Sequence, residues 1–131
     1  MSITDPTVSQ KKCDWDEQAL GNIDCCQQVC RQVSEEQFLS ITEDISLKLE
    51  LHNEKYSLLD VGCGNGYLLS HLLEHCSAVA GSDFSHEMIQ KARKTIPSGE
   101  FSCGEALELP FSDNHFERVL VYSVFHYFPT E

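Results

Sequence analysis

The sequence predicts one α/β domain built around a parallel sheet and preceded by helices. From residue 56 onward, short apolar runs alternate with segments of helical periodicity, an order typical of parallel strands joined by right-handed crossovers. The length of 131 residues permits one sizeable core but not two full domains. The contents of 41% hydrophobic and 23% charged residues indicate a globular chain rather than a disordered or fibrous one.

The first segment, residues 1–55, is predicted to be mostly helical, because it contains Gly21 and Pro6 but no other glycine or proline. A first amphipathic helix is expected behind Asp14, a good N-cap, and a second behind the capping-box pair Ser34 and Gln37. In both, apolar residues recur every three or four positions. These are Trp15, Ala19, Ile23, Cys26 and Cys30 in the first helix, and Phe38, Ile41, Ile45 and Leu49 in the second.

The second segment, residues 56–131, is predicted to alternate strands and helices. Ser85 is the expected N-cap of a helix that carries Met88, Ile89 and Ala92 on one face. In chain order, we expect a strand at residues 58–61, a helix through 68–73, a strand at 78–83, the helix after Ser85, and strands at 101–103 and 118–122, with a loop between these last two.

Three glycines, Gly62, Gly64 and Gly66, stand at alternate positions between the first strand and its helix. Such a loop lets the backbone approach a ligand closely, and the following helix directs N–H groups into the same space. In an open parallel sheet, ligands bind beyond the carboxyl ends of the strands, where the strand order reverses. A ligand site is therefore expected here.

The spacing of the loop argues against two common nucleotide sites. A dinucleotide fingerprint needs G-x-G-x-x-G, but Tyr67 occupies the position of its last glycine, which disfavours a dehydrogenase. The lysine and spacing of an ATP-binding P-loop are absent. Asp83, 17 residues beyond Gly66 at the end of the second strand, is placed to accept hydrogen bonds from a ribose diol.

Four motifs resemble those of the class I S-adenosylmethionine-dependent methyltransferases. Residues 58–66 (LLDVGCGNG) resemble motif I, and residues 81–88 (GSDFSHEM) resemble the second motif. Residues 104–111 (GEALELPF), followed by 116–119 (FERV), are similar to the adenine-contacting loop and fourth strand of the small-molecule branch. The resemblance implies a Rossmann-like sheet, S-adenosyl-L-methionine as cofactor, and methyl transfer to a small-molecule acceptor.

The resemblance also implies site residues. Residues 62–66 would form the turn under the methionine part of the cofactor, Asp60 would hold its amino group, and Asp83 would take the ribose hydroxyls. The remaining positions would surround the adenine, the methionine carboxylate and the sulfonium. The complete implied set is Asp60, Gly62, Cys63, Gly64, Gly66, Asp83, Phe84, Met88, Glu105, Ala106, Tyr122 and Ser123.

Catalysis demands little of side chains here, because displacement at a reactive sulfonium depends mainly on alignment and exclusion of water. A general base is needed only where the acceptor loses a proton. His126 is the preferred candidate and His115 the second, because His126 follows the fourth strand toward the expected site. The sequence does not identify the acceptor. A non-catalytic S-adenosylmethionine-binding or interaction module is the alternative function.

Family domains continue past the fourth strand with another helix and three more strands. We therefore expect this chain to be the N-terminal part of a longer fold, truncated at the C-terminus, with residues 1–55 as a cap over the cofactor or substrate. The open edge of the fourth strand is then a surface for self-association.

Charge and hydropathy exclude several partners. With 9 basic and 21 acidic residues, the net charge of −12 argues against nucleic acid and anionic membranes. No apolar run approaches the roughly 20 residues of a membrane helix. Residues 1–10 lack the pattern of a signal peptide, so a cytoplasmic location is expected.

Seven cysteines are present, an odd number, and no C-x-x-C occurs among them. Neither a disulfide framework nor a zinc site is expected. Cys26 and Cys30, one helical turn apart, are interpreted as apolar packing residues rather than metal ligands.

Overall fold

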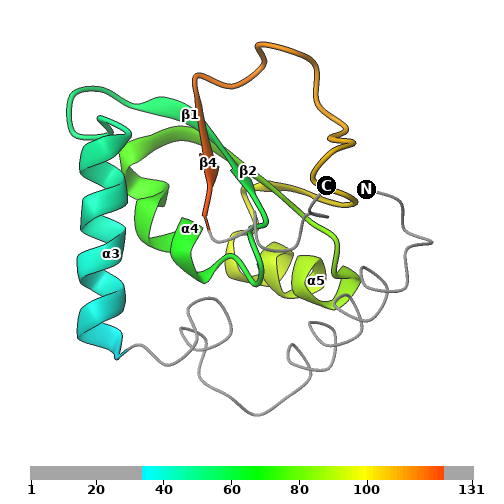
Figure 1. Cartoon of the computed structure of the whole chain (residues 1–131), viewed down its shortest axis with the longest axis horizontal. Coiled ribbons are helices and arrows are strands. Elements are labelled where there is room, and N and C mark those ends of the chain that lie inside the picture. The colour runs from blue at the N-terminus through cyan, green and yellow to red at the C-terminus, as the bar shows by residue number, and fades with distance from the viewer. Residues whose placement is uncertain (1–33, 123–131) are drawn as a thin grey trace, which may run out of the picture.

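The computed structural model describes residues 34–122, in which four parallel strands form one sheet with helices beside it (Figure 1). The predicted α/β architecture is confirmed. The strands are β1 (Tyr56–Val61), β2 (Cys76–Asp83), β3 (Glu100–Cys103) and β4 (Arg118–Val121). The helices are α3 (Glu35–Lys48), α4 (Tyr67–Leu72), the 3-10 helix η1 (Leu73–His75) and α5 (His86–Thr95).

The sheet has the strand order β3-β2-β1-β4. The chain steps from β1 to β2 to β3 in one direction and then returns to place β4 on the other side of β1. In this register Asp60 of β1 lies between Gly81 of β2 and Leu120 of β4. The strand order therefore reverses between β1 and β4, which is where ligands bind in open parallel sheets.

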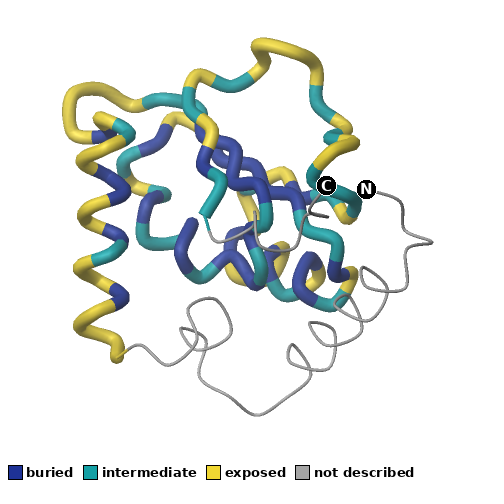
Figure 2. The backbone as a smooth tube through the Cα atoms, in the orientation of Figure 1, coloured by how far each residue is buried: buried dark blue, intermediate teal, exposed yellow. Residues whose placement is uncertain are grey.

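The two faces of the sheet are covered differently. Alternation along β1 directs Leu58 into the larger core, which includes buried residues of α3, α4 and α5, and directs Leu59 and Val61 to the other face. On that second face, the long connection of residues 104–117 takes the place of a crossover helix and packs Phe111 and Phe116 against the sheet. The strands at the centre are mostly buried, whereas the connection of residues 104–117 arches away from the helices and is largely exposed (Figure 2).

The helix α3 begins as predicted. The Ser34 hydroxyl accepts from the Gln37 backbone N–H at 3.2 Å, and the Ser34 N–H donates to the Gln37 side chain at 2.9 Å. Of the predicted apolar stripe, Phe38 and Ile45 are buried in the larger core, and Ile41 and Leu49 pack against it. The predicted capping by Ser85 is likewise confirmed, since its hydroxyl accepts from the Met88 N–H at 3.2 Å.

Arg118 fastens the end of α3 to the first residue of β4. Its Nε donates to the Leu49 carbonyl at 2.8 Å, and its guanidinium lies 3.3 Å from the Glu50 carboxylate. The same guanidinium stacks over the Tyr56 ring, 3.8 Å from the ring centroid. One side chain of β4 thus contacts the end of α3 and the start of β1, more than 60 residues earlier in the sequence.

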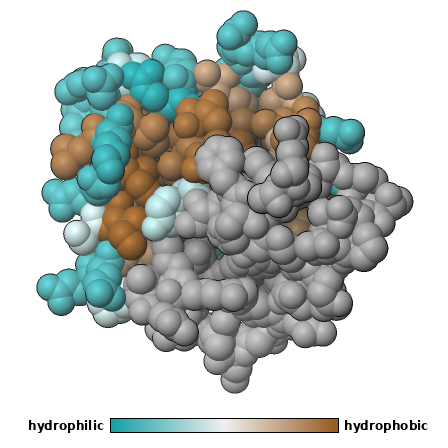
Figure 3. Space-filling view, viewed as in Figure 1, coloured by the Kyte–Doolittle hydropathy of each residue, from teal (hydrophilic) through white to brown (hydrophobic). Residues whose placement is uncertain are grey.

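Several predictions fall outside the described residues: the helix after Asp14, the thiols of residues 13–30, Ser123 and His126. Within residues 34–122, the three cysteines are free thiols, and no group of three metal-ligating side chains comes together. None of the helices in that range is both long and apolar enough to cross a membrane. In the space-filling view, hydrophobic residues gather in the centre of this part and hydrophilic ones at its periphery (Figure 3).

Candidate cofactor-binding site

The predicted site residues within the described part gather toward the carboxyl ends of the four strands. Asp60 and the glycine loop, defined as residues 62–66, come at the end of β1, and Asp83 ends β2. Glu105 and Ala106 follow β3, and Tyr122 follows β4. Because parallel strands end at the same edge of a sheet, the topology brings together residues separated by more than 60 positions.

The glycine loop turns sharply back toward β2. Gly62, Gly64 and Gly66 have φ angles of 82°, 56° and 79°, a region that other residues adopt only with strain. The N–H groups of Gly62 and Cys63 donate to the Ser82 carbonyl at 2.7 and 3.0 Å. The requirement for glycine at these alternate positions is therefore conformational.

Asp83 ties this loop to the start of α5. Its Oδ2 accepts from the Gly64 N–H at 2.9 Å, and its Oδ1 accepts from the Ser85 N–H at 2.9 Å. A carboxylate has about four lone-pair sites, so these bonds are compatible with further acceptance from a diol. Sequence reasoning assigned only the ribose role and missed this structural one.

Asp60 lies beneath the loop with 3% of its surface exposed. Burial, followed by the negative charge of Asp83, raises the pKa of Asp60 to about 7. A cationic ligand group placed beside it would favour the ionised carboxylate and lower this pKa. Such a carboxyl is suited to a positively charged partner.

Cys63 contributes its backbone to the loop and its side chain to the core. The thiol is 1% exposed, and burial raises its pKa well above the usual range. A Cβ at Gly81 would lie 2.7 Å from the Cys63 Sγ, so the glycine in β2 makes room for this side chain. Only the Cys63 backbone is thus oriented to serve the predicted site.

Glu105 holds a buried acceptor. Among the buried side-chain nitrogen and oxygen atoms of residues 34–122, Glu105 Oε1 lacks a hydrogen-bond partner. An unsatisfied buried acceptor costs about 1–3 kcal/mol, and a ligand N–H that donates to it would relieve this cost. The structure therefore offers an acceptor where the sequence predicts the adenine amino group.

The other predicted contact residues differ in exposure: Met88 is buried, whereas Ala106 and Tyr122 are partly exposed. Met88 is 1% exposed, on the buried stripe of α5. Ala106 packs against the smaller core, which Leu59, Val61 and Ala80 form on the face of the sheet opposite the helices. Tyr122 packs against the larger core. Their roles in cofactor binding stay predictions.

Asn65 and Tyr67 belong to the loop region but were not predicted as functional. Asn65 is 3% exposed, and its Oδ1 accepts from the Tyr67 N–H at 3.0 Å. This is an Asx turn, and an asparagine two residues before a helix start is the sequence signal that could have identified it.

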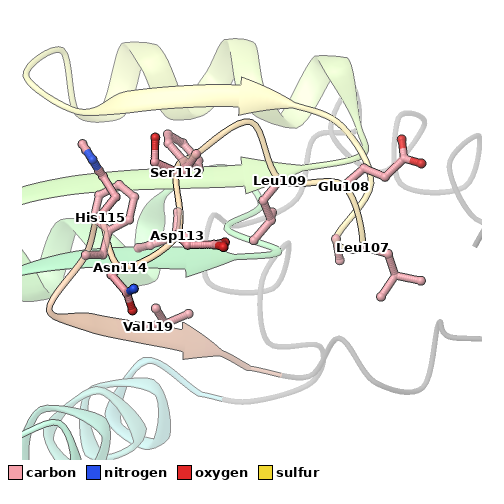
Figure 4. A pocket seen from close by; sticks show the side chains of 12 residues that line it. Leu107, Glu108, Leu109, Ser112, Asp113, Asn114, His115 and Val119 are labelled. Atoms are coloured by element: carbon pink, nitrogen blue, oxygen red, sulfur yellow. The ribbon is translucent and has the colours of Figure 1, made fainter.

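A groove of about 540 Å³ lies between the long connection and strands β1 and β4, on the sheet face that carries Leu59 (Figure 4), and the predicted cofactor-binding residue Ala106 lines it. None of residues 62–66 lines it, and neither does Asp83. Leu107 and Glu108 lie toward the carboxyl ends of the strands and His115 toward their amino ends (Figure 4). His115, the second candidate base, is therefore at the opposite end of the sheet from the glycine loop.

Comparison with known sequences finds similarity to methyltransferases. A family model described as a methyltransferase domain matches residues 58–131. The demethylmenaquinone methyltransferase of Thermotoga maritima is 36% identical over 80 residues, which cover 59% of this chain and 34% of that protein. The phosphatidylethanolamine N-methyltransferase of Cereibacter sphaeroides is 41% identical over 69 residues, covering 48% of this chain and 34% of that protein. The chain thus spans about a third of the length of these relatives.

Among solved structures, the phosphoethanolamine N-methyltransferase 1 of Haemonchus contortus, in complex with phosphoethanolamine and S-adenosylhomocysteine, is similar with a TM-score of 0.76. The two are 20% identical, and the match covers 98% of this chain and 28% of that one. At this identity the likeness shows the fold, a Rossmann-like methyltransferase sheet.

Proposed function

The chain belongs to the methyltransferase domain family, and on that basis we propose that it binds S-adenosyl-L-methionine and serves methyl transfer to a small-molecule acceptor. The observation that carries the proposal is the glycine loop bonded to Asp83 through the Gly64 N–H, at the carboxyl edge of the sheet. The buried Glu105 Oε1, an acceptor without a partner, supports an adenine-bearing ligand.

The residues fit the cofactor by chemistry. The loop backbone of residues 62–66 would take the methionine part, Asp60 its ammonium group, Asp83 the ribose hydroxyls and Glu105 the adenine amino group. We further propose that Phe84, Met88 and Ala106 flank the adenine, and that Tyr122 and Ser123 lie beside the carboxylate or the sulfonium.

When bound, the cofactor supplies a methyl group on a positively charged sulfur. The chain then contributes alignment and electrostatics: the loop fixes the ligand at the sheet edge, and the Asp60 carboxylate, ionised beside a cation, neutralises charge. His126 remains the proposed base for acceptors that lose a proton.

Calorimetry with S-adenosylhomocysteine tests the cofactor site. Asp83→Asn keeps the shape and one oxygen acceptor but removes the charge, so we expect affinity to fall about tenfold or more. Asp113→Asn, at an exposed acid in the groove, is the matched control and should bind like the parent chain. Absence of binding by the folded parent chain, shown by circular dichroism, would refute the proposal.

Transfer of labelled methyl groups to a panel of small acceptors tests the activity. Because the relatives act on demethylmenaquinone and phosphatidylethanolamine by name, both belong in the panel. Binding without turnover on any acceptor would favour the non-catalytic binding module instead. The same methyl-transfer assay is then run on a chain extended at its C-terminus. Activity that appears only in the extended chain would show that residues beyond 131 are needed for turnover, whereas inactivity of both would favour the binding module. Cytoplasmic location and self-association through β4 stay predictions.

A further inference from the structure

An aromatic cluster joins α3 to the residue that follows the glycine loop. The Phe38 ring lies 4.8 Å from the Tyr67 ring and 5.3 Å from the His71 ring, measured between centroids. The Tyr67 and His71 rings are 4.7 Å apart at an interplanar angle of 73°. Phe38 is fully buried, so the cluster is a packed contact between two helices that are separate in the sequence.

The cluster acts on the loop through the Tyr67 backbone. The Tyr67 N–H donates to Asn65 Oδ1 at 3.0 Å, which closes the last turn of the loop. At the other side, His71 Nδ1 donates to the Tyr67 carbonyl at 2.9 Å, because a carbonyl oxygen only accepts. Tyr67 is therefore held by its ring, its N–H and its carbonyl.

The loop needs such support from outside. Its three glycines adopt positive φ, and glycine loses more conformational freedom on ordering than any other residue. The hydrogen bond from Gly64 to Asp83 fixes the middle of the loop. At the exit, the Gly66 N–H donates to the Cys63 carbonyl at 3.1 Å, and Tyr67 forms the junction with α4. We infer that Phe38 is a positioning residue for the glycine loop. By packing against the Tyr67 ring, it keeps the loop in the observed conformation, with its three glycines at positive φ.

The effect on affinity rests on the proposed function, whereas the effect on loop order does not. A merely structural role for Phe38 predicts that its loss lowers stability without changing the loop in the folded protein. Ile45, two helical turns further along α3 and 7% exposed, belongs to the same core and provides the matched control.

Phe38→Leu and Ile45→Ala are compared with the parent chain, both at a temperature where circular dichroism shows them folded. Amide hydrogen exchange of residues 62–67, followed by NMR, is measured without ligand. We expect Phe38→Leu to accelerate exchange at Gly64, Gly66 and Tyr67 about three- to tenfold, because aromatic pairs contribute beyond their buried area. Ile45→Ala should leave these amides unchanged. Tyr67→Phe, which retains the ring, should also behave like the parent chain.

Calorimetry with S-adenosylhomocysteine completes the test. Phe38→Leu should weaken binding by a similar three- to tenfold, while Ile45→Ala binds like the parent chain. Equal exchange rates in Phe38→Leu and Ile45→Ala would overturn the inference. If the parent chain does not bind but Phe38→Leu still loosens the loop, the proposed function fails and the positioning role stands.

Discussion

Replacing Asp60 by asparagine is expected to remove most of a steep pH dependence of stability. Burial raises the pKa of Asp60 to about 7 in the folded chain, against about 3.9 in the unfolded one. Between these values the unfolded chain has lost the proton and the folded chain has kept it, so raising the pH favours unfolding. A difference of about 3 units corresponds to a loss of up to about 4 kcal/mol between pH 4 and pH 8.

Urea unfolding at several pH values between 4 and 8 measures this loss. Asp60→Asn mimics the neutral carboxyl in shape and does not titrate, so its advantage over the parent chain should grow with pH and level off above about 7. Asp113→Asn, at an exposed loop position, should follow the parent chain at every pH. A difference between Asp60→Asn and the parent that stays constant across this range would refute the reasoning.

The remaining predictions concern packing and the adenine acceptor. Gly81→Ala should lower the free energy of unfolding by about 1–3 kcal/mol, because its Cβ would lie 2.7 Å from the Cys63 Sγ; an unchanged Tm would contradict this. Arg118→Lys should lower the free energy of unfolding by about 1–2 kcal/mol in urea unfolding, since lysine lacks the planar guanidinium that bonds the Leu49 carbonyl and stacks on Tyr56. Equal stability of the variant and the parent chain would show that these Arg118 contacts contribute nothing. Glu105→Leu, which removes both acceptor oxygens, should weaken S-adenosylhomocysteine binding about tenfold in calorimetry, whereas Glu108→Leu should bind like the parent chain; equal affinities of the two variants would contradict the acceptor role.

Local chemistry explains which features were predictable from sequence. Ser34 and Ser85 cap their helices through hydrogen bonds that span three residues, and such short-range bonds can be recognised from spacing alone. The strand at β1 was predicted two residues shorter than observed, at residues 58–61 rather than Tyr56–Val61, because strand ends depend on neighbouring strands.

The sequence predicts which residues belong to the candidate site but not how they bond to one another. The glycines and Asp83 follow from motif spacing, whereas the bond between Gly64 and Asp83 joins residues 19 positions apart and exists only once β1 and β2 pair. The inward side chain of Cys63 depends on space left by Gly81 in the neighbouring strand.

The sequence by itself therefore determined the alternation of strands and helices, the helix caps and the glycine loop, because each depends on residues a few positions apart. The tertiary structure alone decided three further features: the buried Asp60 carboxyl, the Phe38 contact with Tyr67, and the location of His115 at the far end of the sheet. Burial, ring packing and strand order arise from contacts between distant segments, and a local pattern carries no information about which distant segment will supply the contact.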